Sequence, residues 1–156
     1  MVVVAQLLQR ARRSGLTIAT AESCTGGMVA AALTAVAGAS DVFTCGFVTY
    51  SNPAKMALLG VQASDLAQYG AVSPAVARAM ADGALARSAA SLAVSITGIA
   101  GPGGSDFKPE GRVCFGLARA GAATTVATVE FGALGRDKVR RAARDHALTL
   151  LFDAMA

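Results

Sequence analysis

Residues 16–36, LTIATAESCTGGMVAAALTAV, contain the junction that decides the fold of this chain. The stretch begins with a strand-like run over residues 16–20 and passes through Gly26 and Gly27 into a run of small apolar residues over 28–36. Paired glycines allow positive φ angles and close backbone approach, so they favour a tight turn between a strand and a helix. A strand that leads through such a turn into a helix is a building unit of α/β domains.

Apolar periodicity, β-branched runs and turn residues predict the other elements. The expected strands are residues 16–20, 43–50, 91–97, 112–119 and 124–131. One helix is expected to end at residues 14–15, and another to begin with Asn52 as its N-cap and Pro53 as its first residue. Further helices are expected over residues 28–36, 64–69, 74–87 and 135–154. Helices alternate with the first three strands and a hairpin follows. This order predicts one domain over residues 1–156, a three-layer α/β/α fold with a mostly parallel mixed sheet and one antiparallel strand.

The composition excludes several classes of protein. A chain of 156 residues suits one domain, which buries about 70% of the surface of its unfolded form. Although 54% of the residues are hydrophobic, no apolar run reaches the roughly 20 residues that cross a bilayer. The first residues lack the basic and apolar regions of a secretory signal, so we expect a cytoplasmic protein without a membrane partner.

Cysteine, histidine and charge patterns narrow the choice of ligand. Cys24, Cys45 and Cys114 form no CxxC pair and, with the single His146, offer no zinc spacing, so we expect reduced thiols, no metal and no cofactor. The formal net charge of +4 favours an anionic small molecule. No stretch combines clustered Lys and Arg with aromatic residues, so no nucleic-acid partner is expected.

Three loops of unusual composition follow three successive predicted strands. They contain Ser23, residues 50–55 and residues 97–104. In open α/β sheets, ligands bind outside the carboxyl ends of the parallel strands, so these loops are expected to share one rim. Taken alone, Ser23 is compatible with a helix cap and Lys55 with a solvated surface lysine. Their placement after successive strands favours a shared ligand site.

Ser23 and Lys55 together predict acyl transfer. A serine nucleophile needs a base, and His146 lies deep within the last helical pattern, so a Ser-His-Asp triad is not expected. A lysine can act as the base if burial and positive potential around it lower its pKa. Lys55 falls in the first turn of a helix, where the macrodipole disfavours an ammonium ion and acts in that direction. Ser23 would then attack an amide or ester carbonyl while Lys55 takes its proton and returns one to the leaving group.

Other residues around this pair leave alternatives open. The oxyanion would be held by amides of residues 24–27 or by those around Gly98. Tyr50 either orients Lys55, contacts the substrate or packs at the end of its strand. Cys24 is a rival nucleophile, because a thiol beside a helix N-terminus can have a lowered pKa, but it has no histidine nearby.

Three charged residues have two explanations each. Glu22 either hydrogen-bonds within the site or satisfies neighbouring backbone amides. Arg136 and Arg140 are four residues apart and share a helix face. They either grip a phosphate or form a solubilising stripe with neighbouring aspartates.

Four ordered motifs, spread over almost the whole chain, resemble one known family. They are AESCTGG at residues 21–27, YSNPAK at 50–55 with LGV at 59–61, GAVS at 70–73 and TGIAGP at 97–102. On these motifs the sequence is similar to the CinA C-terminal domain family, whose stand-alone members include the PncC-type nicotinamide-nucleotide amidases. No molybdopterin-binding-like domain precedes the motifs, so we expect a free-standing member with the family's anticodon-binding-domain-like, three-layer fold.

The resemblance implies hydrolysis of the carboxamide of nicotinamide mononucleotide to nicotinic acid mononucleotide and ammonia, in pyridine-nucleotide salvage. It implies catalytic roles for Ser23, Lys55 and Tyr50, and a homodimer or larger homo-oligomer. The substrate contacts expected with it are Glu22, Thr25, Gly26, Gly27, Thr97, Gly98, Gly101, Gly103, Arg136 and Arg140.

The chain departs from the usual family pattern at two places. Glu110 stands where the family commonly has an apolar residue, and Leu134-Gly135-Arg136 replaces a Gly-Asp-Arg segment. Neither change touches Ser23 or Lys55. The alternative functions are a non-catalytic nucleotide- or phosphate-binding module of the same fold, and an RNA-binding domain prompted by positive charge and fold analogy alone.

Overall fold

The computed structural model of the protein describes residues 1–105 and 107–155. Its elements are α1 (Val4–Ser14), β1 (Ile18–Glu22), α2 (Met28–Thr34), the 3-10 turn η1 (Ala39–Asp41), β2 (Phe43–Val48), α3 (Asn52–Leu59), α4 (Ala63–Tyr69), α5 (Pro74–Ala86), β3 (Leu92–Gly98), β4 (Arg112–Arg119), β5 (Thr125–Glu130) and α6 (Arg136–Ala154). Helices alternate with strands as far as β3, and β4 and β5 then form the expected antiparallel hairpin.

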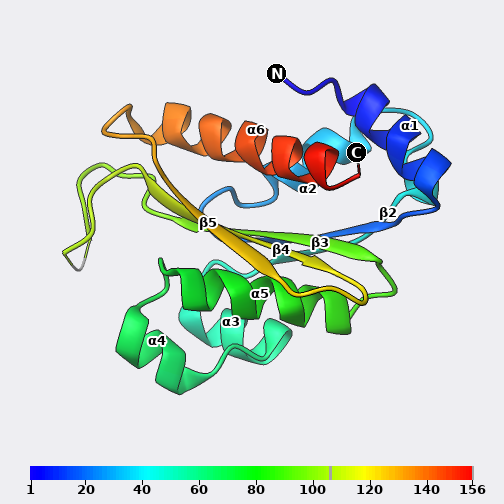
Figure 1. Ribbon diagram of the computed structural model, residues 1–156. Coiled ribbons are helices and arrows are strands. Elements are labelled where there is room, and N and C mark those ends of the chain that lie inside the picture. The colour runs from blue at the N-terminus through cyan, green and yellow to red at the C-terminus, as the bar shows by residue number, and fades with distance from the viewer. Residues whose placement is uncertain (106, 156) are drawn as a thin grey trace.

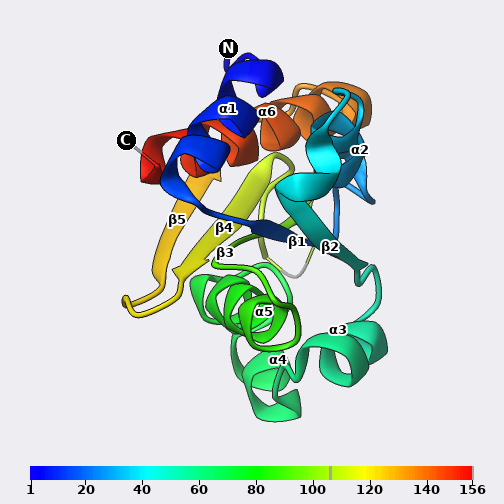
Figure 2. The same cartoon turned by 90° about the vertical axis from the view of Figure 1, so that its right-hand side faces the viewer.

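The strands form one mixed sheet in the order β2-β1-β3-β4-β5. β1 pairs in parallel with β2 and β3, whereas β4 is antiparallel to both β3 and β5. Among the strands described, β4 alone therefore runs against the others. Figure 1 shows α1, α2 and α6 on one face of the sheet and α3, α4 and α5 on the other, and the turned view of Figure 2 agrees. The predicted three-layer α/β/α class with a mostly parallel sheet is confirmed.

Each face of the sheet has its own apolar core. The larger core lies between the sheet and α1, α2 and α6, where an α6 stripe of Val139, Ala143, Ala147 and Leu151 is fully buried. The smaller one lies under α5 and α3. All of β1 is buried, because helices cover both of its faces and strands flank both of its edges. Because β1, β2 and β3 run in parallel, their carboxyl ends meet at one rim of the sheet.

Several element boundaries differ from the sequence-based prediction by one or two residues, and two of these differences concern the site. β1 begins two residues later than expected and continues through Glu22, because its register pairs Ile18 with strand residues on both sides and Glu22 with Val48 and Ile96. The N-cap of α3 is Ser51 and not Asn52: the Ser51 hydroxyl accepts from the N–H of Ala54 at 3.2 Å. Both differences concern residues next to the site: Glu22 directly precedes Ser23, and Ser51 caps the helix that carries Lys55.

Helices α3 and α5 approach each other closely at Gly83. A Cβ atom built on Gly83 would overlap the backbone carbonyl of Leu59, at the C-terminal end of α3. Any side chain at this position would push α3 away from α5. Since α3 carries Lys55, the glycine in α5 helps to set the depth of that residue.

We expect Gly83→Ala to lower the free energy of unfolding by about 1 to 3 kcal/mol, because overpacking outweighs the roughly 1 kcal/mol that alanine gains over glycine in a helix. Gly121→Ala is the matched control: Gly121 has a φ of 79° with open space around it, so this change carries only backbone strain of about 1 kcal/mol. Denaturant unfolding measures both variants. A Gly83→Ala protein as stable as the wild type would contradict this packing.

Candidate active site

Ser23 lies in the turn that joins β1 to α2. Its backbone N–H donates to the carbonyl of Ile96 on β3 at 2.9 Å, which ties the end of β1 to the neighbouring strand. The Ser23 carbonyl accepts from the N–H of Gly26 at 3.0 Å, and Gly26 and Gly27 have φ angles of 56° and 104°. The turn therefore depends on glycine, and it holds Ser23, which is 8% exposed, at the rim of the sheet.

Lys55 points from α3 to Ser23 and is only 1% exposed. Its Nζ donates to the Oγ of Ser23 and to the backbone carbonyl of Thr49, each at 2.9 Å. The Thr49 N–H in turn donates to the carbonyl of Glu22 at 2.8 Å, so the acceptor is fixed to β1. The structure thus brings the two expected catalytic side chains together, and the interpretation of Lys55 as a solvated surface lysine is wrong.

Burial lowers the pKa of the Lys55 amine below its ordinary value, because the interior solvates an ammonium ion less well than water does. The neighbouring Cys24 acts in the opposite direction. A lowered pKa agrees with the sequence-based prediction, and its main cause is desolvation by burial. A larger neutral fraction lets the amine accept a proton from Ser23.

The neighbouring thiol is a poor nucleophile. Cys24 is 5% exposed, and burial raises its pKa to about 12. The charge of Arg140 opposes this shift without cancelling it. At neutral pH the thiol is therefore protonated, whereas only a thiolate attacks a carbonyl efficiently. Of the two candidate nucleophiles in the turn, the structure favours Ser23.

His146 lies in an aromatic cluster on α6. Its ring centroid is 4.6 Å from that of Phe115 and 6.2 Å from that of Phe131. Burial lowers its pKa, so the imidazole is neutral core packing rather than a charge carrier. This position agrees with the expectation that no Ser-His-Asp triad exists here.

Glu22 holds the turn from the inside. Its carboxylate is fully buried and accepts from the Thr25 hydroxyl at 2.6 Å and from the amides of Val29 and Ala30 at 2.9 and 3.1 Å. These amides belong to the first turn of α2, where carboxylates are stabilised. Of the two explanations for Glu22, the one that satisfies backbone amides therefore matches the structure.

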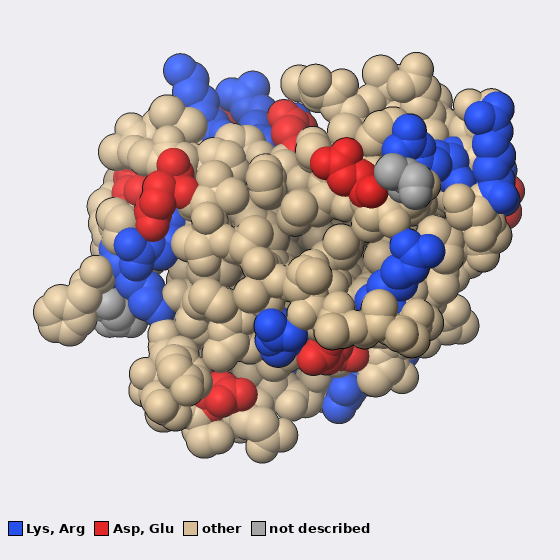
Figure 3. Space-filling view, in the orientation of Figure 1, with Lys and Arg blue, Asp and Glu red and all other residues tan. Residues whose placement is uncertain are grey.

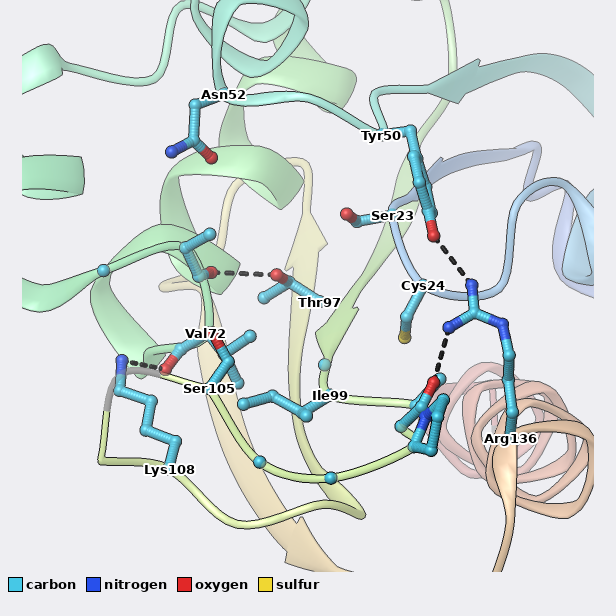
Figure 4. A pocket seen from close by; sticks show the side chains of 18 of the residues that line it. Ser23, Cys24, Tyr50, Asn52, Val72, Thr97, Ile99, Ser105, Lys108 and Arg136 are labelled. Atoms are coloured by element: carbon cyan, nitrogen blue, oxygen red, sulfur yellow. Dashed lines mark hydrogen bonds between the residues drawn. The ribbon is translucent and has the colours of Figure 1, made fainter.

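A cavity of about 410 Å³ opens beside Ser23. Its walls come from the turn after β1, α3 and the residues before it, residues 70–72, the loop over 97–105, Lys108 and Arg136. Figure 4 shows the labelled side chains around this space. Of the expected substrate contacts, those that line it are Thr97, Gly98, Gly101, Gly103 and Arg136. Those that the structure places outside its lining are Glu22, Thr25, Gly26, Gly27 and Arg140.

The two arginines expected to act as a pair are separated by their contacts. Arg136 donates to the Gly101 carbonyl at 2.7 Å and to the Tyr50 hydroxyl at 2.8 Å, at the cavity wall in Figure 4. Arg140 instead donates to the Cys24 carbonyl at 3.0 Å, behind the turn. This geometry does not place Arg136 and Arg140 where both could bind one phosphate. The neighbouring aspartates pair with other arginines of α6.

Residues 70–72 and Lys108 line the cavity, although no chemical role was predicted for them. The Thr97 hydroxyl donates to the Ala71 carbonyl at 2.8 Å, and the Lys108 Nζ donates to the carbonyls of Tyr69 and Val72 at 2.6 Å each. The GAVS motif at residues 70–73 was the only signal for this wall. Lys108 carried no signal, because a lysine in a loop is usually solvated.

The glycine-rich loop is braced by the residue that departs from the family pattern. A Glu110 oxygen accepts from the N–H of Gly103 at 2.7 Å. Gly101 has a φ of 91°, which favours glycine, and a Cβ there would displace the Glu110 side chain. The amide of Gly103 is thus engaged within the loop, which argues against its expected role as a donor to substrate.

The described lining of the cavity carries positive charge. It contains Lys55, Lys108 and Arg136 and, within residues 1–105 and 107–155, no acidic side chain. On the face shown in Figure 3, acidic and basic side chains are interspersed.

Among the described residues, no cluster of His, Cys, Asp and Glu could hold a metal ion. In the same part of the chain, no helix has both the length and the apolarity needed to cross a membrane.

A buried lysine bonded to a serine, at a strand-to-helix turn of a three-layer α/β/α domain, defines a candidate serine/lysine hydrolase. The family model named CinA C-terminal domain matches residues 2–155. The chain therefore belongs to the CinA C-terminal domain family.

Known proteins of two lengths resemble the chain. The nicotinamide-nucleotide amidohydrolase PncC of Escherichia coli strain K12 is 49% identical over 94% of this chain and 89% of that protein. A CinA-like protein of Mycobacterium sp. strain JLS is 50% identical over 91% of this chain, which spans only 34% of that protein. The crystal structure of the competence/damage inducible protein CihA from Agrobacterium tumefaciens has a TM-score of 0.90 and 43% identity, with 99% of both chains covered.

Replacing Lys55 by methionine should change the pH dependence of stability. In the wild type, the folded amine has a lower pKa than the unfolded one, so at low pH the native state carries the full cost of a buried charge. As the pH rises through the folded pKa, the native amine loses its proton first and the wild type gains stability. We expect the advantage of Lys55→Met in free energy of unfolding to shrink as the pH rises through the lowered folded pKa towards the ordinary lysine value of about 10.4. A gap that is constant with pH would contradict a lowered pKa, and Lys138→Met, at an exposed α6 position, is the control.

Cys24 should resist alkylation. With a pKa near 12 its thiolate is scarce, so at about pH 8 we expect iodoacetamide to modify Cys24 at least about 1000-fold more slowly in the folded than in the unfolded protein. Peptide mapping by mass spectrometry gives the rate at this residue. Fast modification of folded Cys24 would restore it as a nucleophile.

Proposed function

We propose that this protein is an amidohydrolase that converts nicotinamide mononucleotide into nicotinic acid mononucleotide and ammonia. The observation that carries the proposal is the 2.9 Å contact between the buried Lys55 Nζ and the Ser23 Oγ at the cavity. The similarity to the nicotinamide-nucleotide amidohydrolase PncC of E. coli supports the substrate class. The positive lining of the cavity supports an anionic ligand.

The first half of the reaction forms an acyl-enzyme. Neutral Lys55 takes the proton of the Ser23 hydroxyl, and the Ser23 Oγ adds to the carboxamide carbon to give a tetrahedral oxyanion. The carbonyl then re-forms as the carbon–nitrogen bond breaks. The Lys55 ammonium returns its proton to the leaving nitrogen, which departs as ammonia and leaves an ester on Ser23.

The second half returns the enzyme to its starting state. A water molecule gives a proton to neutral Lys55 and adds to the ester carbon. Collapse of the second tetrahedral intermediate breaks the bond to Ser23, and Lys55 returns the proton to the serine oxygen. One water is consumed, and the products are the nicotinate carboxyl group and ammonia.

The oxyanion donor that we assign is the backbone amide of Cys24. It follows Ser23 directly, and Cys24 lines the cavity. The amides of Gly26 and Met28 donate to carbonyls within the turn, at 3.0 Å each, so they are engaged. The dipole of α2 adds positive potential at this turn.

Substrate contacts are proposed for Thr97, Tyr50 and Arg136, which line the cavity. A cavity of about 410 Å³ falls within the usual range for small-molecule sites. The Tyr50 hydroxyl accepts from Arg136, and Tyr50 is 61% exposed, so it can close over a bound ligand. We place the reaction in cytoplasmic pyridine-nucleotide salvage by a single domain. The homodimer or larger assembly stays a prediction.

Ammonia release from nicotinamide mononucleotide tests the mechanism. We expect Ser23→Ala to lose at least about 1000-fold in kcat, because the nucleophile is gone. Lys55→Arg should lose a similar factor, because a guanidinium keeps its proton at neutral pH. Lys138→Arg, the same exchange at an exposed position, should keep the wild-type rate. Wild-type turnover by Ser23→Ala or Lys55→Arg would overturn the roles assigned to these residues.

The same assay separates the amidase from a non-catalytic binding module. Tight binding of the mononucleotide by the wild-type protein with no ammonia released at any pH would contradict the amidase. The binding module would then be the better account of the positive cavity.

A further inference from the structure

Lys108 brings a fixed positive charge into the cavity at a distance from the nucleophile. In Figure 4 its side chain lies across the cavity from Ser23, beside Val72. The Nζ donates to the carbonyls of Tyr69 and Val72. An ammonium group has three donors, so one N–H remains beyond these two bonds. The two carbonyls hold the charge in place without neutralising it.

Ser105 lies opposite Lys108 in the loop. Ser105 and Lys108 face each other in an isolated antiparallel bridge, in which each backbone N–H donates to the other's carbonyl, at 2.9 and 2.7 Å. Side chains of directly opposed residues project to the same side of such a bridge. Both residues line the cavity. A Cβ on Gly104 would overlap the Lys108 carbonyl, so glycine keeps the bridge closed.

The other basic side chains of the described lining, Lys55 and Arg136, are engaged in other contacts. Lys55 is bonded to Ser23. Arg136 donates to Gly101 and Tyr50 and lies on the Ser23 side of the view in Figure 4. A mononucleotide whose carboxamide reaches Ser23 extends its phosphate away from that residue. The charge that it meets at the opposite wall is Lys108.

We propose that Lys108 and the hydroxyl of Ser105 bind the phosphate of the mononucleotide substrate. This assignment rests on the proposed function for the position of the carboxamide. It replaces the Arg136 and Arg140 pair expected from the sequence, whose second member is turned away from the cavity. It also gives Lys108 a role in substrate specificity, because a nucleoside lacks the phosphate that would bind to this residue.

Affinities for a nucleotide and its nucleoside test the assignment. In a Ser23→Ala background, which binds without turnover, calorimetry measures nicotinamide mononucleotide and nicotinamide riboside. We expect Lys108→Met to weaken mononucleotide binding at least about tenfold, as for loss of a charge-assisted hydrogen bond, and to leave riboside binding within about twofold. Lys108→Arg keeps the charge and should restore most of the affinity. Ser105→Ala should weaken only the mononucleotide, by a smaller factor.

The controls separate this role from a structural one. If Lys108 only fastened the loop to residues 69–72, Lys108→Met would weaken both ligands equally, and that result would overturn the proposal. Unchanged mononucleotide affinity, or no binding of the mononucleotide before any change at Lys108, would also overturn it. Lys138→Met, at an exposed position on α6, should affect neither ligand.

Hydrolysis by the protein with Ser23 intact is measured separately. A selective loss of nucleotide affinity in Lys108→Met, together with no ammonia release by the wild type, would support the phosphate site and reject the amidase. Normal hydrolysis with no selective loss would support the amidase and reject the phosphate site.

Discussion

The Lys55 amine is buried against the Ser23 hydroxyl, and removing an amine from water is costly unless its charge is lost or its N–H groups are satisfied. The structure favours the neutral amine and also provides a hydrogen-bond acceptor for it. Burial lowers the pKa, and the Thr49 carbonyl accepts one hydrogen bond. The arrangement requires that the end of β1, the residues after β2 and the first turns of α3 stay in fixed relation. The parallel pairing of β1 with β2 and the Ser51 cap supply that relation.

The nucleophile turn is held from two sides, and neither support lines the cavity. Glu22 fixes the first amides of α2 from within the fold, and Arg140 of α6 holds the Cys24 carbonyl. Ser23 consequently meets Lys55 in a geometry that does not depend on a ligand. Such preorganisation is what a proton transfer between the two groups requires, because little reorganisation is left to the reacting state. The α6 helix thus contributes to the site through its contacts with backbone carbonyls as well as through its buried stripe.

The opposite wall of the cavity is built from loops and is held by side chains. Thr97 and Lys108 donate to carbonyls of residues 69–72, and Glu110 engages the amide of Gly103. A loop without a regular hydrogen-bond ladder needs such donors to satisfy its carbonyls. The same bonds place charge and hydroxyl groups at fixed points around the cavity. The proposed catalytic pair and the proposed phosphate site therefore lie on opposite sides of one space, the first on the sheet rim and the second on the loop.

Local patterns in the sequence were sufficient to predict the layers, the hairpin and the shared rim, because periodicity and turn residues act over a few neighbours. The pairing of Ser23 with a lysine was also predictable, since both follow strands of one parallel sheet. Only the tertiary structure decided that Lys55 is buried, that Glu22 faces inward and that Arg136 lines the cavity while Arg140 lies behind the turn. Ser23 and Lys55 are 32 residues apart and Lys108 and Tyr69 are 39 apart, so their contacts arise only when whole elements pack. Burial and desolvation, which set the pKa values, are properties of that packing and have no counterpart in a short stretch of sequence.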